Sequence, residues 1–297
     1  MSDKIVLITG ATEGVGKETA VQLAKKGFHI VMMVRSLKKA QQAKKEIVER
    51  SGNKNVDHLI ADFTSFRQVK EAAEQFNQKY PKLDVLINNA GLMYPDREIT
   101  EDGFELSFQV NHLSHFLLTH LLLDKLKLSE QGRIVNLSSE GHKMGKFDPA
   151  NFNAEKSFGG IAQYCFTKLC NIYFTYSLAE KLKGTKITVN AVHPGVVKSR
   201  FGSDHDKGWL KPLFSVSRLF MISVEKGAAT SVYAASDPGL ATTTGKYLKN
   251  SKITGTKGIT HNANNQKILW DYSMDKCGLK SKKVVGNISQ IPDTLVV

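Results

Sequence analysis

Short apolar runs alternate with longer amphipathic stretches from the start of the chain to about residue 195. The short runs are rich in β-branched residues and have the length of buried strands, whereas the longer ones repeat apolar residues at helical spacing. The pattern predicts strands at Lys4–Ile8, His29–Val34, Val56–Ala61, Asp84–Ile87, Arg133–Leu137 and Lys186–Val192. It predicts helices at Gly14–Lys26, Leu37–Arg50, Phe66–Tyr80, Glu105–Leu126 and Ile161–Lys183. Strands separated by helices imply a single doubly wound α/β domain, in which helices cover both faces of a parallel sheet.

The alternation ends after Pro194. Residues 198–223 mix glycine, lysine, serine and bulky apolar residues without a clear period, so we predict an irregular substrate flap with a short helical piece there. A helix at Val224–Ser236 and a strand at Lys246–Lys249 complete the predicted fold. The domain is expected to span residues 1–255, and residues 256–297 form a C-terminal extension for which the sequence predicts no definite structure.

The composition is that of an ordinary soluble globular protein. Of the 297 residues, 41% are hydrophobic and 23% are charged, and the most apolar run, Phe116–Leu126, is broken by His120 and Asp124. We therefore expect neither a signal peptide nor a transmembrane segment. Three cysteines form no even-numbered framework and no CxxC pair, so the expected location is the reducing cytoplasm.

The net charge of +13 permits nucleic-acid contact, attachment to an anionic surface or attraction of a phosphorylated ligand. The lysines are spread along the chain without a basic block interleaved with aromatic residues. This distribution favours a generally basic, solvated surface over nucleic-acid binding. The basic tail from Lys276 onward, KCGLKSKK, is expected to be peripheral, as an arm on the surface or close to a membrane surface.

The segments that follow the strands carry the candidate chemistry, because a doubly wound sheet binds its ligand at the carboxyl ends of its strands. The first strand is followed by TGATEGVGKETA, with glycines at Gly10, Gly14 and Gly16. Glycines between a strand and a helix let backbone N–H groups and the helix N-terminus approach a diphosphate. The spacing is GxxxGxG rather than GxGxxG, and by itself it would also suit a tight turn that binds nothing.

The next three strand ends add features of a nucleotide site. Arg35 follows the second strand, where sites selective for NAD carry an acid that binds the ribose 2′-hydroxyl. A guanidinium there favours the 2′-phosphate of NADPH over NADH, although an ordinary surface arginine would look the same. Asp62 follows the third strand and could accept a hydrogen bond from an adenine amine. NNAG, residues 88–91, follows the fourth and would let the backbone lie along a ribose, or would be a plain loop.

The segment AQYCFTKLCN contains the candidate catalytic pair. Tyr164 and Lys168 are four residues apart and therefore share one face of a helix. A free tyrosine has a pKa near ~10, and a neighbouring cation favours the phenolate, so Lys168 is predicted to lower the pKa of Tyr164 and make it a general acid/base. Taken alone, the pair would also suit a packed tyrosine and a lysine that extends to solvent.

In sequence order, TGATEGVG, NNAG, Asn111, the serines at 138 and 139, and YCFTK together resemble the single-domain branch of the short-chain dehydrogenase/reductase family. The resemblance runs from residue 3 to about residue 250. The segments FQVNHLSHF, RIVNLSSEGH, HPGVV and EKGAATSVYAASDP are similar to those of the retinol dehydrogenase-like, NADP-dependent group of that family. The resemblance implies a Rossmann-type fold and hydride transfer between NADP(H) and a carbonyl or alcohol.

The resemblance also implies roles for single residues. Tyr164 would exchange a proton with the carbonyl oxygen, Lys168 would lower its pKa and hold the nicotinamide ribose, and Ser139 would hydrogen-bond the substrate oxygen. Asn111 would hold a relay water. Besides Tyr164 and Lys168, the implied cofactor-binding residues are Gly10, Thr12, Glu13, Gly14, Val15, Gly16, Arg35, Asp62, Phe63, Asn89, Ala90, Gly91, Pro194, Gly195, Val197 and Ser199.

The chain departs from this group at two places. Members that sit in membranes carry an apolar anchor before the first strand, and MSDKIVLITG has none, so membrane residence and a retinoid substrate are left open. The 24 residues between Ser139 and Tyr164 are a longer insert than in many relatives, and we expect them to form part of the pocket wall.

Other residues suggest further sites that we do not favour. His112, His115 and His120 are spaced along an apolar helix and are better explained by packing or an interface than by a metal ion. Cys165 is expected to be a small core residue rather than a redox-sensitive thiol. The helices at 105–126 and 161–183 are apolar on more than one face, which is compatible with a homodimer as well as with a monomer.

Three functions compete. The leading one is an NADPH-dependent carbonyl reductase or alcohol dehydrogenase for an apolar aldehyde or ketone, since the flap carries apolar and aromatic residues at Phe201, Trp209, Leu210, Phe214 and Phe220. A cofactor-sensing protein of the same fold would not need an acid/base set. A sugar-nucleotide epimerase shares the Tyr and Lys pair but usually has differently spaced glycines and a larger C-terminal region.

Overall fold

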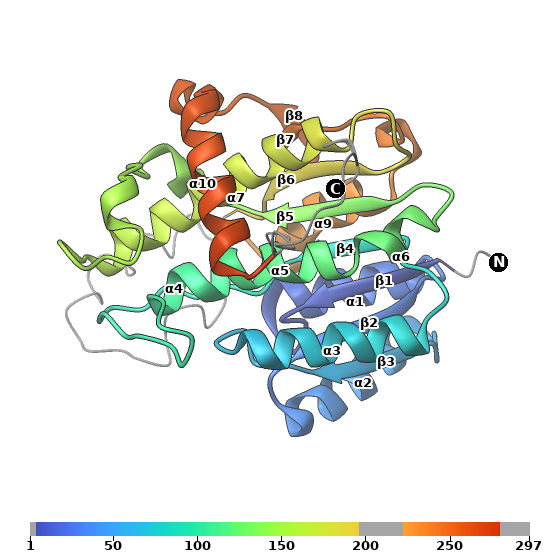
Figure 1. Ribbon diagram of the computed structural model, residues 1–297. Coiled ribbons are helices and arrows are strands. Elements are labelled where there is room, and N and C mark those ends of the chain that lie inside the picture. The colour runs from blue at the N-terminus through green and yellow to red at the C-terminus, as the bar shows by residue number, and fades with distance from the viewer. Residues whose placement is uncertain (1–3, 196–221, 280–297) are drawn as a thin grey trace, which may run out of the picture.

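The computed structural model describes residues 4–195 and 222–279 and has one sheet of eight strands in the order β3-β2-β1-β4-β5-β6-β7-β8 (Figure 1). All neighbouring strands are parallel except the last pair, β7 and β8, which is antiparallel. The strands are β1 (Ile5–Thr9), β2 (His29–Val34), β3 (Val56–Ile60), β4 (Val85–Asn88), β5 (Arg133–Leu137), β6 (Thr188–His193), β7 (Lys246–Lys249) and β8 (Lys252–Thr254). The predicted doubly wound α/β fold is confirmed.

Helices cover both faces of this sheet (Figure 1). The main ones are α1 (Gly14–Lys25), α2 (Leu37–Ser51), α3 (Phe66–Lys79), α5 (Ser114–Leu121), α7 (Gly160–Lys181), α9 (Val224–Ser236) and α10 (Ala263–Lys276). Shorter pieces are α4 (Leu106–Phe108), the π-helical turn η1 (Gln109–Leu113), α6 (Leu123–Lys127), and the 3₁₀ turns η2 (Glu140–Lys143), η3 (Pro149–Asn151), η7 (Pro238–Leu240) and η8 (Gly258–His261). Among the described residues no helix combines the length and apolar content needed to cross a bilayer.

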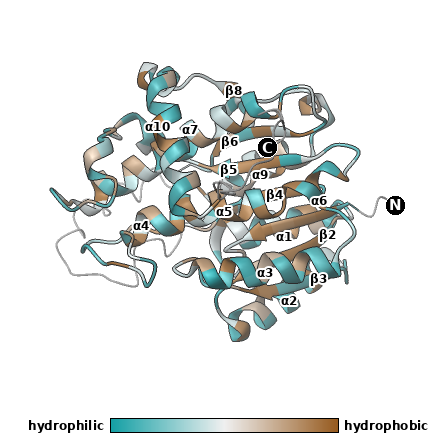
Figure 2. Cartoon of the chain, viewed as in Figure 1, coloured by the Kyte–Doolittle hydropathy of each residue, from teal (hydrophilic) through white to brown (hydrophobic). Residues whose placement is uncertain are grey.

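Side chains of β1 show how the two layers form. Ile5 and Leu7 belong to one hydrophobic cluster with residues of α3, α5 and α7, whereas Val6 and Ile8 belong to a second cluster with residues of α1, α2 and α9. The strand is buried on both faces and therefore reads as a continuous apolar run, which appears as brown strands between the helices in Figure 2.

The predicted single helix at Glu105–Leu126 is wrong in detail, because the segment is divided into α4, η1, α5 and α6. The Glu105 carboxylate caps the start by accepting hydrogen bonds from the N–H groups of Ser107 and Phe108. The π-helical turn that follows has the wider hydrogen bond from Ser114 N to Gln109 O. Such a turn inserts one residue into the helix and changes the direction of the side chains around Asn111.

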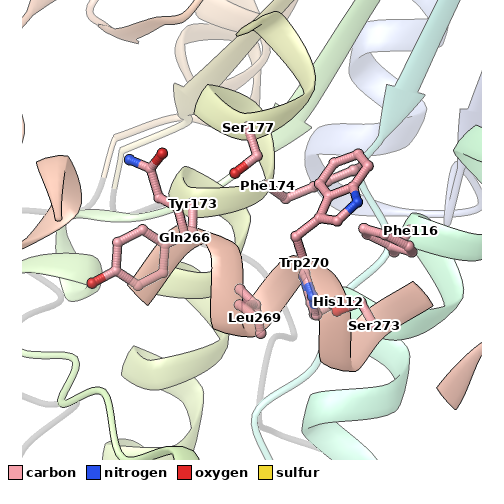
Figure 3. Close-up of a pocket in the computed structure, with 9 residues that line it drawn as sticks. All are labelled: His112, Phe116, Tyr173, Phe174, Ser177, Gln266, Leu269, Trp270 and Ser273. Carbon is pink, nitrogen blue, oxygen red and sulfur yellow. Dashed lines mark hydrogen bonds between the residues drawn. The ribbon is translucent and has the colours of Figure 1, made fainter. Parts of the chain in front are cut away.

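The C-terminal extension, for which the sequence predicted no definite structure, contains α10, which packs against α7 (Figure 1). Asn262 caps this helix by accepting a hydrogen bond from Asn265 N. The Trp270 ring lies 5.1 Å from Phe116 of α5, and Figure 3 shows the side chains where the three helices meet. Leu269 is 2% exposed and belongs to the same cluster as α3 and α5, so α10 is part of the main hydrophobic core.

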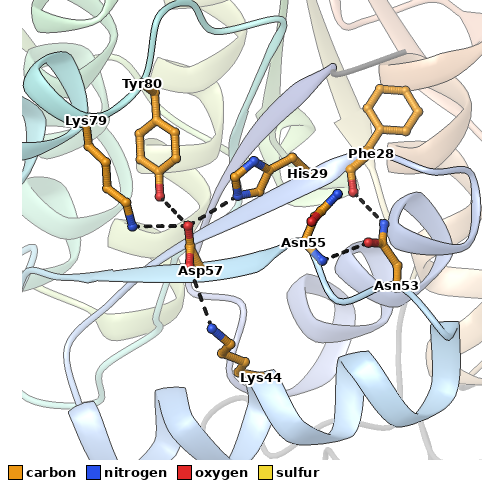
Figure 4. Close-up of polar contacts among 8 residues, drawn as sticks. All are labelled: Phe28, His29, Lys44, Asn53, Asn55, Asp57, Lys79 and Tyr80. Atoms are coloured by element: carbon orange, nitrogen blue, oxygen red, sulfur yellow. Dashed lines mark hydrogen bonds and ion pairs between the residues drawn. The ribbon is translucent and has the colours of Figure 1, made fainter. Parts of the chain in front are cut away.

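A charged cluster fixes the edge strand β3 to its neighbours (Figure 4). The Asp57 carboxylate accepts hydrogen bonds from Lys79 Nζ at 3.1 Å and Tyr80 OH at 2.9 Å, and it lies 3.3 Å from His29 Nε2 and 3.6 Å from Lys44 Nζ. Burial alone would raise the pKa of Asp57, but these hydrogen bonds lower it to about 2. Lys44 and Lys79, which belong to the basic surface, are thus paired with a carboxylate of the same chain.

Two predicted segments lie outside the described residues: the substrate flap, up to residue 221, and the basic tail from residue 280.

Leu269→Ala tests whether α10 is a stabilising part of the core. Removing a buried leucine side chain leaves a cavity, so the free energy of unfolding should fall by about 2–4 kcal/mol in urea titrations. Lys267→Ala, on the exposed side of the same helix, removes only a surface ion pair to Asp271 and should change it by less than about 0.5 kcal/mol. Equal effects of the two substitutions would mean that α10 does not contribute to the core.

Candidate active site

The turn between β1 and α1 requires glycine at the positions that the sequence singled out. Gly10 and Gly14 have positive φ angles of 66° and 57°. A Cβ on Gly10 would lie 2.9 Å from the Ala90 Cα, and one on Gly16 would lie 2.6 Å from the Gly10 carbonyl oxygen. The glycines therefore let the backbone of this turn lie directly against the NNAG turn after β4.

The first turn of α1 suits a diphosphate. Glu13 occupies the N-cap position, is exposed, and makes no side-chain capping hydrogen bond. Among the described residues, the N–H groups of Gly14, Val15 and Gly16 have no acceptor, whereas Thr12 beside them is half-buried. A helix N-terminus with free donors and a glycine turn is a suitable binding site for the phosphates of a dinucleotide. The predicted pyrophosphate residues thus fit the group.

The NNAG turn is held against β1 by the hydroxyl of Thr9. Thr9 Oγ1 accepts hydrogen bonds from Asn89 N and Ala90 N, both at 2.8 Å. The Asn89 side chain donates from Nδ2 to the Thr9 carbonyl oxygen at 2.7 Å. This arrangement places the half-buried backbone of Asn89, Ala90 and Gly91 at the same edge as the glycine turn.

The residues after β2 and β3 differ in whether their side chains are available to contact a ligand. Arg35 is exposed directly after β2, and among the described residues it has no hydrogen bond or ion pair, so its guanidinium is available to an anion. The Asp62 carboxylate accepts hydrogen bonds from Thr64 N and Oγ1 at 3.0 and 2.9 Å. Phe63 is only 5% exposed and its ring lies 4.9 Å from that of His115, so its side chain faces the core and only its backbone borders the edge.

The side chains of Ser139, Tyr164 and Lys168 lie at this edge, close to two glycines. The Cβ position of Gly141 is 3.5 Å from Ser139 Oγ and 3.6 Å from Tyr164 Cε1. The Cβ position of Gly91 is 3.4 Å from Lys168 Nζ. Lys168 Nζ lies 5.5 Å from the centre of the Tyr164 ring. The structure therefore brings the hydroxyl of Ser139 to the phenol and ammonium groups of α7, which lie 25 or more residues later in the sequence.

Asn111 lies in the π-helical turn and anchors the chain after the NNAG turn. Its Oδ1 accepts from Leu92 N at 2.8 Å, and its Nδ2 donates to Leu92 O at 2.8 Å and to Thr167 Oγ1 at 3.0 Å. These contacts use both N–H groups of Nδ2 and one of the two lone pairs of Oδ1.

The electrostatics differ from the expectation that Lys168 lowers the pKa of Tyr164. Burial raises the pKa of Tyr164 to about 12, and the neighbouring Ser139 hydroxyl opposes this shift only in part. Burial lowers the pKa of Lys168 to about 8. Lys168 Nζ donates a hydrogen bond to Leu137 O at 3.2 Å rather than to the phenol, which explains why its charge does not dominate. Without a bound cofactor, Tyr164 is a protonated phenol at neutral pH.

A charged group next to Ser139 was missed by sequence reasoning. Glu140 directly follows Ser139, and its carboxylate accepts hydrogen bonds from Lys143 Nζ at 2.8 Å and Tyr247 OH at 2.9 Å and pairs with Lys249 Nζ at 3.2 Å. In the sequence, the one feature that pointed to Glu140 was its position directly after Ser139. All these charges are satisfied within the fold.

The end of β6 is described only in part. His193 is buried, and Pro194 and Gly195 follow it at the same edge, with a φ of 86° at Gly195. Val197 and Ser199, which the sequence assigned to the cofactor, lie outside the described residues.

The three spaced histidines bind different partners. His112 Nε2 lies 3.0 Å from Ser273 Oγ, His115 Nε2 lies 2.8 Å from Thr9 Oγ1, and His120 Nδ1 lies 2.8 Å from Phe116 O. Within residues 4–195 and 222–279, no three His, Cys, Asp or Glu side chains gather as a metal site requires. Cys165 is buried, and burial raises the pKa of its thiol.

Known proteins resemble this chain over most of its length. The family model of the short chain dehydrogenases matches residues 4–208. Retinol dehydrogenase 11 of Mus musculus is 40% identical over 279 residues, which cover 93% of this chain and 87% of that protein.

Solved structures agree with the fold. An uncharacterised protein from Mycobacterium paratuberculosis superposes with a TM-score of 0.76 at 27% identity, covering 93% of this chain and 94% of that one. A variant of actinorhodin polyketide ketoreductase, solved with NADPH, superposes with a TM-score of 0.65 at 26% identity, covering 83% of this chain and 95% of the ketoreductase.

Buried neutral histidines should make the fold sensitive to acid. Burial lowers the pKa of His112 to about 4, of His115 to about 3 and of His193 to about 4. A histidine with a depressed pKa stabilises the fold fully above its unfolded pKa of about 6.5, and this contribution is lost as the pH falls toward the folded value. For each of these histidines, the free energy of unfolding should fall by about 2 kcal/mol between pH 7.5 and pH 5, as measured by urea unfolding. A free energy of unfolding that stays constant over this range would contradict the buried, neutral state of these rings.

Proposed function

Because the chain belongs to the short-chain dehydrogenase family, in the group similar to retinol dehydrogenases, we propose that it is an NADP(H)-dependent oxidoreductase that reduces an apolar aldehyde or ketone. Members of this family bind a nicotinamide cofactor and act on small molecules. The observation that best supports the proposal is that the side chains of Ser139 and Tyr164 lie close together, since Ser139 Oγ and Tyr164 Cε1 are 3.5 and 3.6 Å from the same Cβ position of Gly141. A carbonyl oxygen bound between these two side chains could accept a hydrogen bond from each hydroxyl group.

The protonation states of the side chains support reduction. When bound, the cofactor would supply the hydride. Tyr164, which holds its proton because burial raises its pKa to about 12, would donate that proton to the oxygen of the substrate as negative charge develops there. Ser139 would position the same oxygen by a hydrogen bond. Lys168, whose Nζ lies beside Gly91, would hold the ribose of the nicotinamide. Its positive charge would stabilise the phenolate that forms when Tyr164 gives up its proton.

The preference for NADPH rests on Arg35. Its exposed guanidinium follows β2 at the position where a 2′-phosphate would lie, and an arginine pairs with a phosphate through two parallel hydrogen bonds. The solved ketoreductase at 26% identity holds NADPH, which agrees with this assignment.

An uncharged, apolar substrate is supported by the substrate side of the site. Within the part of the chain that the structure describes, the Glu140 carboxylate next to Ser139 is paired with Lys143 and Lys249, so it is not available to a cationic substrate. Phe147 and Phe152, in the insert before Tyr164, pack 5.2 Å apart. The name of the relative, retinol dehydrogenase 11, agrees with a large apolar substrate.

The cytoplasm remains the proposed location. A homodimer through the apolar faces of α5 and α7 also stays a prediction. Since α10 packs on α7 and its Trp270 contacts Phe116 of α5, a partner would have to bind around α10.

Tyr164→Phe tests the acid role. The variant keeps the ring but lacks the proton, so kcat for reduction should fall by about 10²- to 10⁴-fold, whereas the Kd of NADPH should be unchanged. NADPH oxidation is followed with a panel of retinal, medium-chain aldehydes, and steroid and quinone carbonyls. Tyr176→Phe, on the same helix but bonded to Thr256, is the matched control and should keep full activity. Undiminished turnover by Tyr164→Phe would remove this mechanism.

Arg35→Ala tests the cofactor preference. Loss of a charge-assisted contact with the 2′-phosphate should weaken NADPH binding by about 10- to 100-fold and leave NADH binding unchanged, as measured by calorimetry. Arg67→Ala removes an exposed guanidinium of α3 that pairs with Glu71 and serves as the control. Tighter binding of NADH than of NADPH by the unmodified protein would contradict the role given to Arg35.

A further inference from the structure

His115 is a buried titratable group at the candidate site that the proposed mechanism does not use. It lies on α5, is 3% exposed, and its ring packs against Phe63 at the end of β3. Its Nε2 is 2.8 Å from Thr9 Oγ1 and its Nδ1 is 3.3 Å from the carbonyl oxygen of Asn111. The imidazole thus lies between the strand that leads into the glycine turn and the π-helical turn that carries Asn111.

The hydrogen bonds of Thr9 fix the tautomer of this imidazole. A hydroxyl has one proton and two lone pairs, and the N–H groups of Asn89 and Ala90 occupy the lone pairs of Thr9 Oγ1. Its proton must therefore go to an acceptor. His115 Nε2 at 2.8 Å is a much better one than Ile87 O at 3.5 Å. Nε2 must then be unprotonated, and the single proton of the neutral ring lies on Nδ1 and points to Asn111 O, which can only accept.

This gives a directed series of hydrogen bonds through the site. The NNAG turn donates to Thr9, Thr9 donates to His115, and His115 donates to the backbone of Asn111. The Asn111 side chain in turn donates to Thr167, the residue before Lys168. Protonation of the ring would place a second donor against the Thr9 hydroxyl, and burial disfavours it further.

We infer that His115 is a positioning residue: its neutral ring, with the proton on Nδ1, holds the nucleotide-binding turns after β1 and β4 in register with Asn111 and, through Thr167, with the helix that carries Tyr164 and Lys168. It acts through its contacts with the Thr9 hydroxyl and the Asn111 carbonyl. The inference rests on the proposed NADP(H) site.

The tautomer can be measured on the unmodified protein. In ¹⁵N-histidine-labelled protein at pH 7, the imidazole ¹⁵N shifts of His115, assigned by their loss in His115→Gln, should be those of a neutral ring protonated on Nδ1. A ring protonated on Nε2 alone or on both nitrogens would overturn the inference. This result does not depend on whether the protein turns over any substrate.

Two variants test the positioning role. His115→Phe keeps a ring against Phe63 but leaves the buried Thr9 hydroxyl and Asn111 carbonyl without this partner, so NADPH should bind about tenfold or more weakly and kcat should fall as well. His115→Gln offers one acceptor and one donor and should recover part of both losses. His120→Gln, on the same helix with its own bond to Phe116 O, should match the unmodified protein in both.

The outcomes separate this inference from the proposed function. If folded His115→Phe, judged by circular dichroism, binds NADPH and turns over like the unmodified protein, while Tyr164→Phe is inactive, the positioning role is wrong and the function stands. If His115→Phe loses NADPH affinity and His115→Gln regains it, while Tyr164→Phe stays active, the positioning role stands and the acid role of Tyr164 is wrong. If His115→Gln is as impaired as His115→Phe, hydrogen bonding is not the cause and the inference fails.

Discussion

The candidate site depends on the burial of polar groups where β1, β4 and β5 end side by side. Parallel pairing brings these ends to one edge, and the hydrophobic layers on both faces exclude water from the first residues beyond them. A protein partner for a buried polar atom there is strongly stabilising, because leaving one unpaired costs about 1–3 kcal/mol. Thr9, which is fully buried, meets this requirement with its neighbours on the turn after β4 and with His115. The shape of the nucleotide edge is therefore set by hydrogen bonding inside the protein before any ligand binds.

The same requirement explains the irregular helix between β4 and β5. A regular α-helix over this whole segment would place its residues at a strict 3.6-residue period, whereas the π-helical turn inserts a residue at Asn111. That residue can then bond both to Leu92 and to Thr167 of α7. A deviation from regular structure thus joins the half of the fold that would bind the nucleotide to the helix that carries Tyr164.

Much of the fold and of the candidate site could be predicted from the sequence, because these features depend on residues that are close together in the chain. Strand and helix periods gave the order of the elements, and glycines at 10, 14 and 16 gave the turn, because a positive φ and a close backbone approach exclude other residues. Tyr164 and Lys168 could be placed on one helix face by their spacing. The features that could not be predicted depend on contacts between residues that are far apart in the sequence. Helix α10 has little periodicity of its own and is defined by what Leu269 packs against, and the partner of His115 is a threonine 106 residues away.

The pKa of Tyr164 shows why spacing alone misjudged the chemistry. Four residues on a helix bring a lysine close to a tyrosine, but the effect of its charge depends on burial and on the direction of Nζ. Here Lys168 is 5% exposed, donates to Leu137 O, and has its own pKa lowered to about 8 by burial. The phenol keeps its proton near neutrality because burial raises its pKa to about 12. A protonated acid next to a site for a carbonyl oxygen is the state that reduction consumes, whereas oxidation of an alcohol would first require that proton to be removed. The protonated phenol is therefore suited to the proton donor that the proposed reduction would need.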